Sequence, residues 1–153
     1  MSKFLRYWTP VLVWLVLIFI GSTDLMSAEH TSRIIGPILR WLHPAISPRT
    51  IGQVQIIVRK TAHITEYAVL AMLCFRAITV TLWPNRAVLV AAIVLSCCAF
   101  FAASDEFHQS FVPSRTASLR DVVIDICGGA IGVVLYWLFR QRKLSKRASA
   151  RIN

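Results

Sequence analysis

The chain has 153 residues, of which 56% are hydrophobic and 16% are charged, and its mean hydropathy is +0.61. This composition is too apolar for a soluble protein and the length suits one folding unit, so we predict an integral membrane protein with a single domain over residues 1–153. The net charge of +10 would suggest nucleic acid in a soluble chain. Here six of the seventeen basic residues lie between positions 140 and 151, just after a hydrophobic run, where the cytoplasmic flank of a membrane span belongs. Nucleic-acid binding is therefore not expected.

Four hydrophobic runs predict transmembrane helices, because about 20 apolar residues cross the hydrocarbon core of a bilayer. The first run also fits a signal peptide cleaved after Ala28, but Trp8 and Trp14 are more typical of a packed span with interfacial aromatic residues. We therefore predict an all-α bundle of four transmembrane helices. The expected spans are residues 7–23, 60–83, 87–103 and 121–139, followed by a basic tail over 140–153.

The first connection, residues 24–59, is long, and Pro37, Pro44 and Pro48 divide it into short pieces. Between positions 33 and 43, apolar residues recur among polar ones at near-helical spacing. The pattern fits a short amphipathic helix on the membrane surface or over the end of the bundle, and it fits an ordinary packed loop equally well.

The second hydrophobic run is longer than a bilayer is thick when it is counted from Gly52. One helix over 52–83 would measure about 48 Å, whereas the hydrocarbon core is about 30 Å thick. We therefore expect its first part to project at or above the membrane interface. Four spans place both termini on one side, and the basic tail predicts that this side is the cytoplasm. The first connection is then extracytoplasmic.

Small residues in the last two runs predict close helix packing. The third run is rich in alanine, and in the fourth run Gly128 and Gly132 form a Gly-x-x-x-Gly pair. Such a pair suits packing within the bundle or between two copies in a homo-oligomer. The four cysteines lie in apolar runs without the spacing of a metal motif, so we interpret them as packing residues. They are Cys74, Cys97, Cys98 and Cys127.

Three polar clusters stand at the ends of the last three runs. They are residues 60–67, residues 104–115, and Asp121 with Asp125. The start of the second span, the end of the third and the start of the fourth lie on one side of the membrane, so we expect the clusters to meet. Within each cluster, polar residues recur three or four positions apart and share a helix face. The sequence therefore predicts a polar pocket at the extracytoplasmic face, because polar groups at this depth usually mark a site.

The residue types in this pocket suit proton transfer, metal binding or recognition of charge. A histidine can act as a general base when a carboxylate orients it, and histidines with carboxylates can also hold a divalent metal. A metal is not favoured, because no His-Glu-x-x-His motif is present. The candidates for an acid–base or metal role are His63, Glu66, Asp105, His108 and Asp125. The candidates for binding are Lys60, Tyr67, Glu106, Gln109, Arg115, Arg120 and Asp121, among which Lys60, Arg115 and Arg120 would hold negative charge.

The three clusters resemble the motifs of the VanZ-like family of small bacterial membrane proteins, over about residues 52–138. The resemblance implies a multi-helix inner-membrane protein with a cell-envelope role. The family's namesake is linked to low-level teicoplanin resistance without an established biochemical activity. Two positions depart from the family pattern: Ser114 replaces the glycine of Pro-Gly-Arg, and Asp125 stands where asparagine is more usual. The matching motifs are Lys60-x-x-His63-x-x-Glu66-Tyr67, then Ser104-Asp105-Glu106-x-His108-Gln109-x-Phe111-Val112-Pro113-x-Arg115, then Asp121-x-x-x-Asp125-x-x-Gly128 with Gly132.

The resulting prediction is a membrane protein that recognises or modifies a lipid or lipid-linked component of the cell envelope through this pocket. Two alternatives stay open. One is a non-enzymatic protein whose polar residues form a structural ion network or bind a partner. The other is a small proton-coupled carrier, which would need an oligomer because four helices enclose little space.

Overall fold

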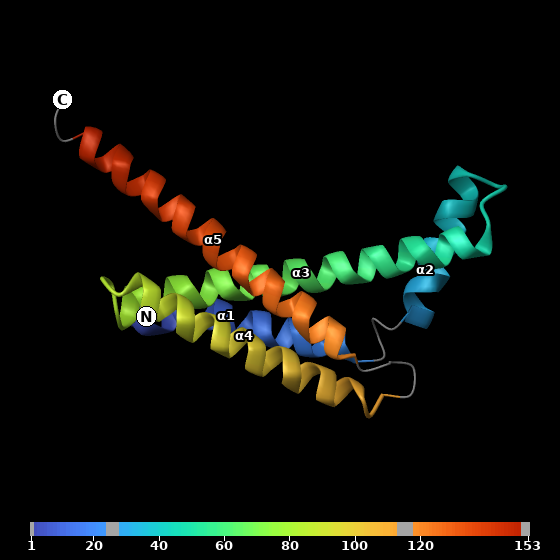
Figure 1. Ribbon diagram of the computed structural model, residues 1–153, viewed down its shortest axis with the longest axis horizontal. Coiled ribbons are helices and arrows are strands. Elements are labelled where there is room, and N and C mark those ends of the chain that lie inside the picture. The colour runs from blue at the N-terminus through green and yellow to red at the C-terminus, as the bar shows by residue number, and fades with distance from the viewer. Residues whose placement is uncertain (1, 24–27, 113–117, 151–153) are drawn as a thin grey trace.

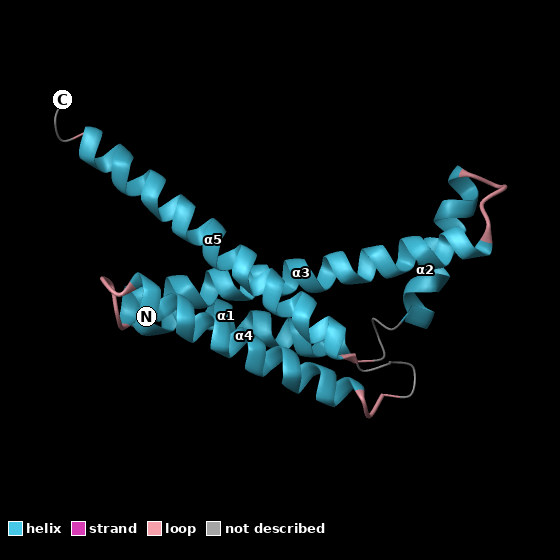
Figure 2. Ribbon diagram, viewed as in Figure 1, coloured by secondary structure: helices cyan, strands magenta, loops and turns pink. Residues whose placement is uncertain are grey.

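A computed structural model describes residues 2–23, 28–112 and 118–150, apart from the side chains of 28–32 and 146–148. Within these ranges all regular secondary structure is helical (Figure 2). The predicted all-α fold is confirmed, together with four helices that are long and apolar enough to cross a membrane, namely α1, α3, α4 and most of α5. The five helices are α1 (Lys3–Ser22), α2 (Ala28–Leu42), α3 (Pro48–Thr81), α4 (Ala87–Gln109) and α5 (Leu119–Ser149).

Helix α3 is the longest helix and begins well before the apolar run that it contains. The hydroxyl of Ser47 accepts a hydrogen bond from the Thr50 amide, and Pro48 occupies the first helical position, where a missing N–H costs nothing. From there the helix continues for 34 residues, about 51 Å, without a break. Its first part therefore extends past the ends of α1 and α4 (Figure 1).

Helix α3 also forms the centre of the bundle, because it contacts each of the other four helices. Tyr67, Leu70 and Phe75 of α3 pack with Val90 and Val94 of α4, and all five side chains are less than 2% exposed. The outer surfaces of the four long helices carry exposed large apolar side chains, which is the arrangement that a surrounding bilayer favours. Examples are Leu12, Val88, Phe100 and Val134.

Helices α3 and α5 approach each other closely. A Cβ atom added at Gly128 would lie 2.5 Å from the carbonyl oxygen of Ile64, and one added at Gly132 would collide with the carbonyl oxygen of Ala68. The backbones of the two helices are thus in direct contact, as small residues at a helix crossing allow. Both glycines face α3 of the same chain, and their use between two copies stays a prediction.

Helix α1 is held against α3 by two tryptophan side chains. The indole N–H of Trp14 donates to the carbonyl oxygen of Glu66 at 2.9 Å, and that of Trp8 donates to Thr81 Oγ1 at 3.2 Å. These bonds join the helices in the first half and near the middle of α1. The C-terminal end of α1 therefore forms one wall of the polar region described below.

The first connection contains the helix α2, so of the two patterns that its sequence fits, the structure shows the helical one. In Figure 1, α2 lies across the projecting end of α3, and the C-terminal part of α5 projects from the opposite end of the bundle. The chain's N-terminus lies at that opposite end as well.

Candidate functional site

The polar clusters come together at one end of the bundle. Helix α1 ends there at Ser22, α4 ends there at Gln109, and α5 begins there at Leu119. Only α3 passes through this level in its middle, because 15 residues of the helix precede His63. The site is therefore built from the ends of three helices arranged around the middle of a fourth.

A buried histidine and carboxylate join α3 to α5. Nδ1 of His63 lies 3.1 Å from Oδ1 of Asp125, and these residues are 8% and 0% exposed. When Nδ1 carries the proton, the imidazole donates to the carboxylate and its Nε2 is left as an acceptor. The second oxygen of Asp125, Oδ2, has no hydrogen-bond partner among the described residues. This geometry orients His63 in the way that a general base requires.

One helical turn before Asp125, Asp121 forms ion pairs with two basic side chains of α3. Nζ of Lys60 lies 2.6 Å from Oδ1 of Asp121, and a guanidinium nitrogen of Arg59 lies 3.9 Å from Oδ2. Asp121 stands in the first turn of α5, where negative charge also favours the helix. The three residues form a partly exposed ion cluster at the rim of the site.

We expect Lys60→Gln to lower the free energy of unfolding by no more than about 1 kcal/mol, because partly exposed ion pairs contribute little. The Lys60 side chain is 36% exposed. Asp121→Asn should cost more, since it removes the partner of both cations and the charge at the helix N-terminus. Unfolding by SDS titration in mild detergent measures both losses. Equal losses for the two variants would contradict this assignment.

Asp105 and Glu106 are neighbours in sequence but have different partners. Oδ2 of Asp105 accepts a hydrogen bond from the side-chain amide of Gln109, one turn later on α4, at 2.8 Å. Oε2 of Glu106 accepts from the backbone amide of Ser118 at 2.5 Å, just before α5. Asp105 therefore stays within α4, whereas Glu106 fixes the chain where α5 begins.

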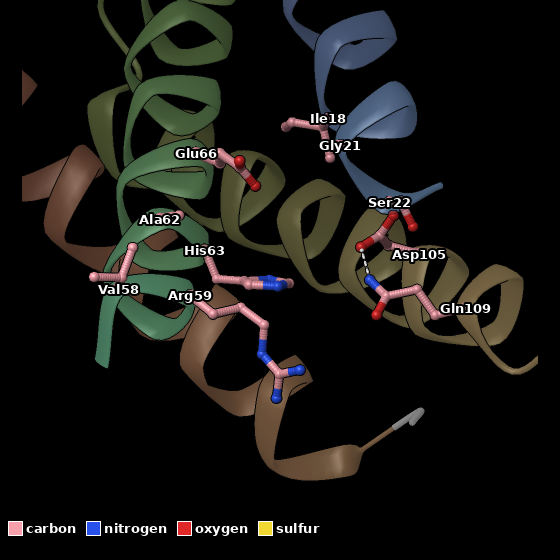
Figure 3. A pocket seen from close by; sticks show the side chains of 10 residues that line it. All are labelled: Ile18, Gly21, Ser22, Val58, Arg59, Ala62, His63, Glu66, Asp105 and Gln109. Atoms are coloured by element: carbon pink, nitrogen blue, oxygen red, sulfur yellow. Dashed lines mark hydrogen bonds between the residues drawn. The ribbon is translucent and has the colours of Figure 1, made fainter. Parts of the chain in front are cut away.

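A cavity of about 100 Å³ opens between α1, α3 and α4 (Figure 3). On one side are Arg59, His63 and Glu66, which follow one another at about one-turn steps along α3. Asp105 and Gln109 of α4 face them, and the α1 side contributes Ile18, Gly21 and Ser22. We call this space the polar cavity. Its remaining lining residues are Val58 and Ala62.

A second cavity of about 220 Å³ adjoins the polar cavity and shares Ile18 and Asp105 with it. We call it the apolar cavity, because most of its lining is hydrocarbon. Two polar atoms there, the hydroxyl of Tyr67 and Nδ1 of His108, are buried without a hydrogen-bond partner in the described part of the chain. The other lining residues are Leu15, Phe19, Phe101 and Ser104.

Of the residues chosen from the sequence, the structure places His63, Glu66, Asp105 and Gln109 on the polar cavity, and Tyr67, Asp105 and His108 on the apolar one. Asp125 and Asp121 do not line either cavity; they bond to His63 and Lys60 of α3. Glu106 bonds to the backbone amide of Ser118. Arg120 is exposed and lines neither cavity. Arg115 and Ser114 lie outside the described residues.

The sequence prediction missed Arg59 and Ser22. Arg59 stands four positions before His63, so the helical spacing that selected the other residues would have selected it too. Ser22 is 3% exposed, and its hydroxyl has no hydrogen-bond partner among the described residues. Nothing in the sequence distinguishes Ser22, because its role depends on where α1 ends against α3.

The donor set does not form a ready metal site. In residues 2–23, 28–112 and 118–150, no three side chains of His, Cys, Asp or Glu are close enough together to hold a metal ion. The arrangement suits hydrogen bonding and proton transfer instead, since it offers an oriented imidazole, two carboxylates, an amide and a guanidinium around one small space.

A protein-family model described as VanZ/LLP1 matches residues 7–140. No curated protein and no solved structure matches the chain.

Proposed function

The chain belongs to the VanZ/LLP1 family, and from that premise we propose that it recognises a lipid or lipid-linked component of the bacterial cell envelope through the polar cavity. The observation that carries the proposal is the pair of adjoining cavities at one end of four apolar helices. A polar space beside an apolar one suits an amphiphile, whose headgroup needs hydrogen bonds and whose chain needs hydrocarbon contact.

The lining of the polar cavity indicates which headgroups it suits. Glu66 and Asp105 supply carboxylates, so the cavity favours groups that donate hydrogen bonds, such as hydroxyls or an ammonium. Arg59 is the cation on the lining and suits a phosphate at the mouth. Arg59 lies 3.9 Å from Asp121, whereas Lys60, which the sequence suggested for that task, lies 2.6 Å from it and is the more tightly held of the two cations. The proposed ligand thus combines a phosphate with hydroxyl or amine groups.

The proposal also covers a reaction, because His63 lines the polar cavity and is oriented by Asp125. In that role Nε2 of His63 takes a proton from a bound hydroxyl or water, and Asp125 stabilises the resulting imidazolium. The ion pairs at the rim equally favour a structural network as the alternative function. The two roles differ in their response to lipid: a headgroup site should raise the melting temperature of the protein when a suitable lipid binds, whereas a structural network should not.

We further propose that the site faces the extracytoplasmic side of the bacterial inner membrane. Basic residues at the other end of the bundle support this orientation, because short cytoplasmic segments carry the excess of Lys and Arg. Those residues are Lys3, Arg6, Arg86, Arg140, Arg142 and Lys143.

Asp105→Asn is the test of the proposed function. The parent protein in detergent should show a higher melting temperature with phosphatidylethanolamine or phosphatidylglycerol than with phosphatidylcholine. Asp105→Asn should lose most of this shift, because the amide replaces an acceptor on the cavity wall with a donor.

Glu106→Gln is the matched control, since it removes a buried charge one residue away that does not line the cavity. This variant should be less stable on its own but keep the full lipid-induced shift. If Asp105→Asn keeps the shift, or the parent shows none with any of these lipids, the cavity is not a headgroup site and the structural network is favoured.

A further inference from the structure

Helix α2 and the start of α3 form an arm that extends beyond the bundle on the side of the two cavities. We define the arm as residues 33–59. In Figure 1, the first part of α3 continues past the ends of α1 and α4, and α2 lies steeply across it. A helix that crosses the projecting end of a membrane span in this way lies close to the plane of the membrane.

The apolar face of α2 is only half covered by protein. Ile35 and Leu39 are partly buried, and within the described chain α2 packs on α3. Ile34, Ile38 and Trp41 are 64%, 51% and 82% exposed. These three residues follow the i, i+4, i+7 spacing of one helix face, so they form a continuous apolar stripe that no described residue covers.

Every charge between residues 33 and 59 is positive, and the acid of α2, Glu29, stands before this range in the helix's first turn. Arg33, Arg40, Arg49 and Arg59 lie in the arm, and no Asp or Glu occurs between residues 30 and 65. On α2, Arg33 and Arg40 are seven positions apart and therefore share a face, which lies beside the apolar stripe. An apolar stripe containing tryptophan beside arginines is the pattern of a helix that lies in a membrane interface and attracts anionic lipids.

The charge also decides between the two possible occupants of the apolar stripe. A second copy of the chain would bring two sets of arginines together, which costs free energy. A surface of anionic headgroups would neutralise them and would bury Trp41 and its neighbours at the boundary of the acyl chains.

We propose that α2 lies in the headgroup layer of the leaflet on the side of the cavities, and that it binds anionic phospholipids there through its arginines and its apolar stripe. Helix α2 thereby sets the depth at which the polar cavity opens. This binding surface is separate from both cavities and does not depend on what they hold.

The test uses the fluorescence of Trp41 in the full-length protein, taken as the difference between the parent and Trp41→Phe. The protein is reconstituted into vesicles of phosphatidylcholine alone or with increasing phosphatidylglycerol. With the anionic lipid, the Trp41 emission should shift to the blue, and acrylamide should quench it less. Arg40→Gln should raise the phosphatidylglycerol fraction needed for half of this protection about fivefold.

Trp83, in the connection between α3 and α4 at the other end of the bundle, supplies the control. The Trp83 emission is taken as the difference between the parent and Trp83→Phe. Its wavelength and its quenching by acrylamide should be the same with and without Arg40→Gln. Equal acrylamide quenching of Trp41 in the two kinds of vesicle would overturn the proposal. Protection that rises with the ratio of protein to lipid at constant composition would also overturn it, because a second copy would then cover the stripe.

Discussion

Gly132→Ala is expected to destabilise the folded protein by about 1–3 kcal/mol, the usual cost of forcing an extra carbon into a packed interface. The new methyl group would collide with the carbonyl oxygen of Ala68, which is backbone and cannot turn aside. Helices α3 and α5 would have to move apart, and the His63–Asp125 pair two helical turns away would be strained. SDS titration of the protein in mild detergent measures the loss.

Gly52→Ala is the matched control for this substitution. It makes the same change within a helix, but nothing lies within 4 Å of the added carbon. Alanine is the better helix former by about 1 kcal/mol, so this variant should be as stable as the parent or slightly more stable. If Gly132→Ala unfolds at the same SDS fraction as Gly52→Ala, the backbones of α3 and α5 are not in direct contact at Gly132.

Asp125→Ala should cost about 3 kcal/mol, because it leaves the buried imidazole of His63 without its acceptor and opens a void. Asp125 is fully buried, so water does not replace the lost partner as it would at the rim. Asp125→Asn keeps an oxygen in the same place and should cost clearly less. The same SDS titration measures both variants.

The partner variant His63→Ala completes a double-mutant cycle with Asp125→Ala. Because the two side chains bond to each other, the loss in the double variant should be smaller than the sum of the single losses by at least about 0.5 kcal/mol. If the loss of stability in the double variant equals the sum of the single losses, the two residues do not interact in the folded protein. Asp125 then does not orient His63, and His63 is not the general base.

The convergence of polar residues on one end of the bundle was visible in the sequence. Asp121, Asp125, Gly128 and Gly132 recur at alternating steps of four, three and four, so they lie along one face of α5. In the structure this whole face lies against α3. The contacts between the two helices, in order along α5, are Asp121 with Lys60, Asp125 with His63, Gly128 with Ile64 and Gly132 with Ala68.

What the spacing could not supply is the identity of each partner. Helical periodicity shows which residues share a face but not which helix that face meets. Asp105 and Asp125 are both acids near the same end of the bundle, yet one bonds within its own helix and the other bonds to α3. That difference depends on the rotation of α4 and α5, which is set by packing over the whole span.

The two cavities could not be predicted from the sequence either, because periodicity does not show which helices enclose a space. Their walls need the end of α1, and α1 carries few polar residues that could have marked it as part of a site. Its place is determined by the indole bonds of Trp8 and Trp14 to α3. A tryptophan in an apolar run gives no indication of which distant residue will accept its N–H.

The pairing of α3 with α5 has a consequence for how the protein is made. Lys60 pairs with Asp121, and His63 pairs with Asp125, at sequence separations of 61 and 62 residues. During synthesis, α3 and α4 therefore enter the membrane before either base has its acid. A chain released after α4 leaves the buried His63 without its carboxylate and α3 without its main packing partner, a state that distinguishes the unfinished protein from the complete one and exposes it to proteolysis.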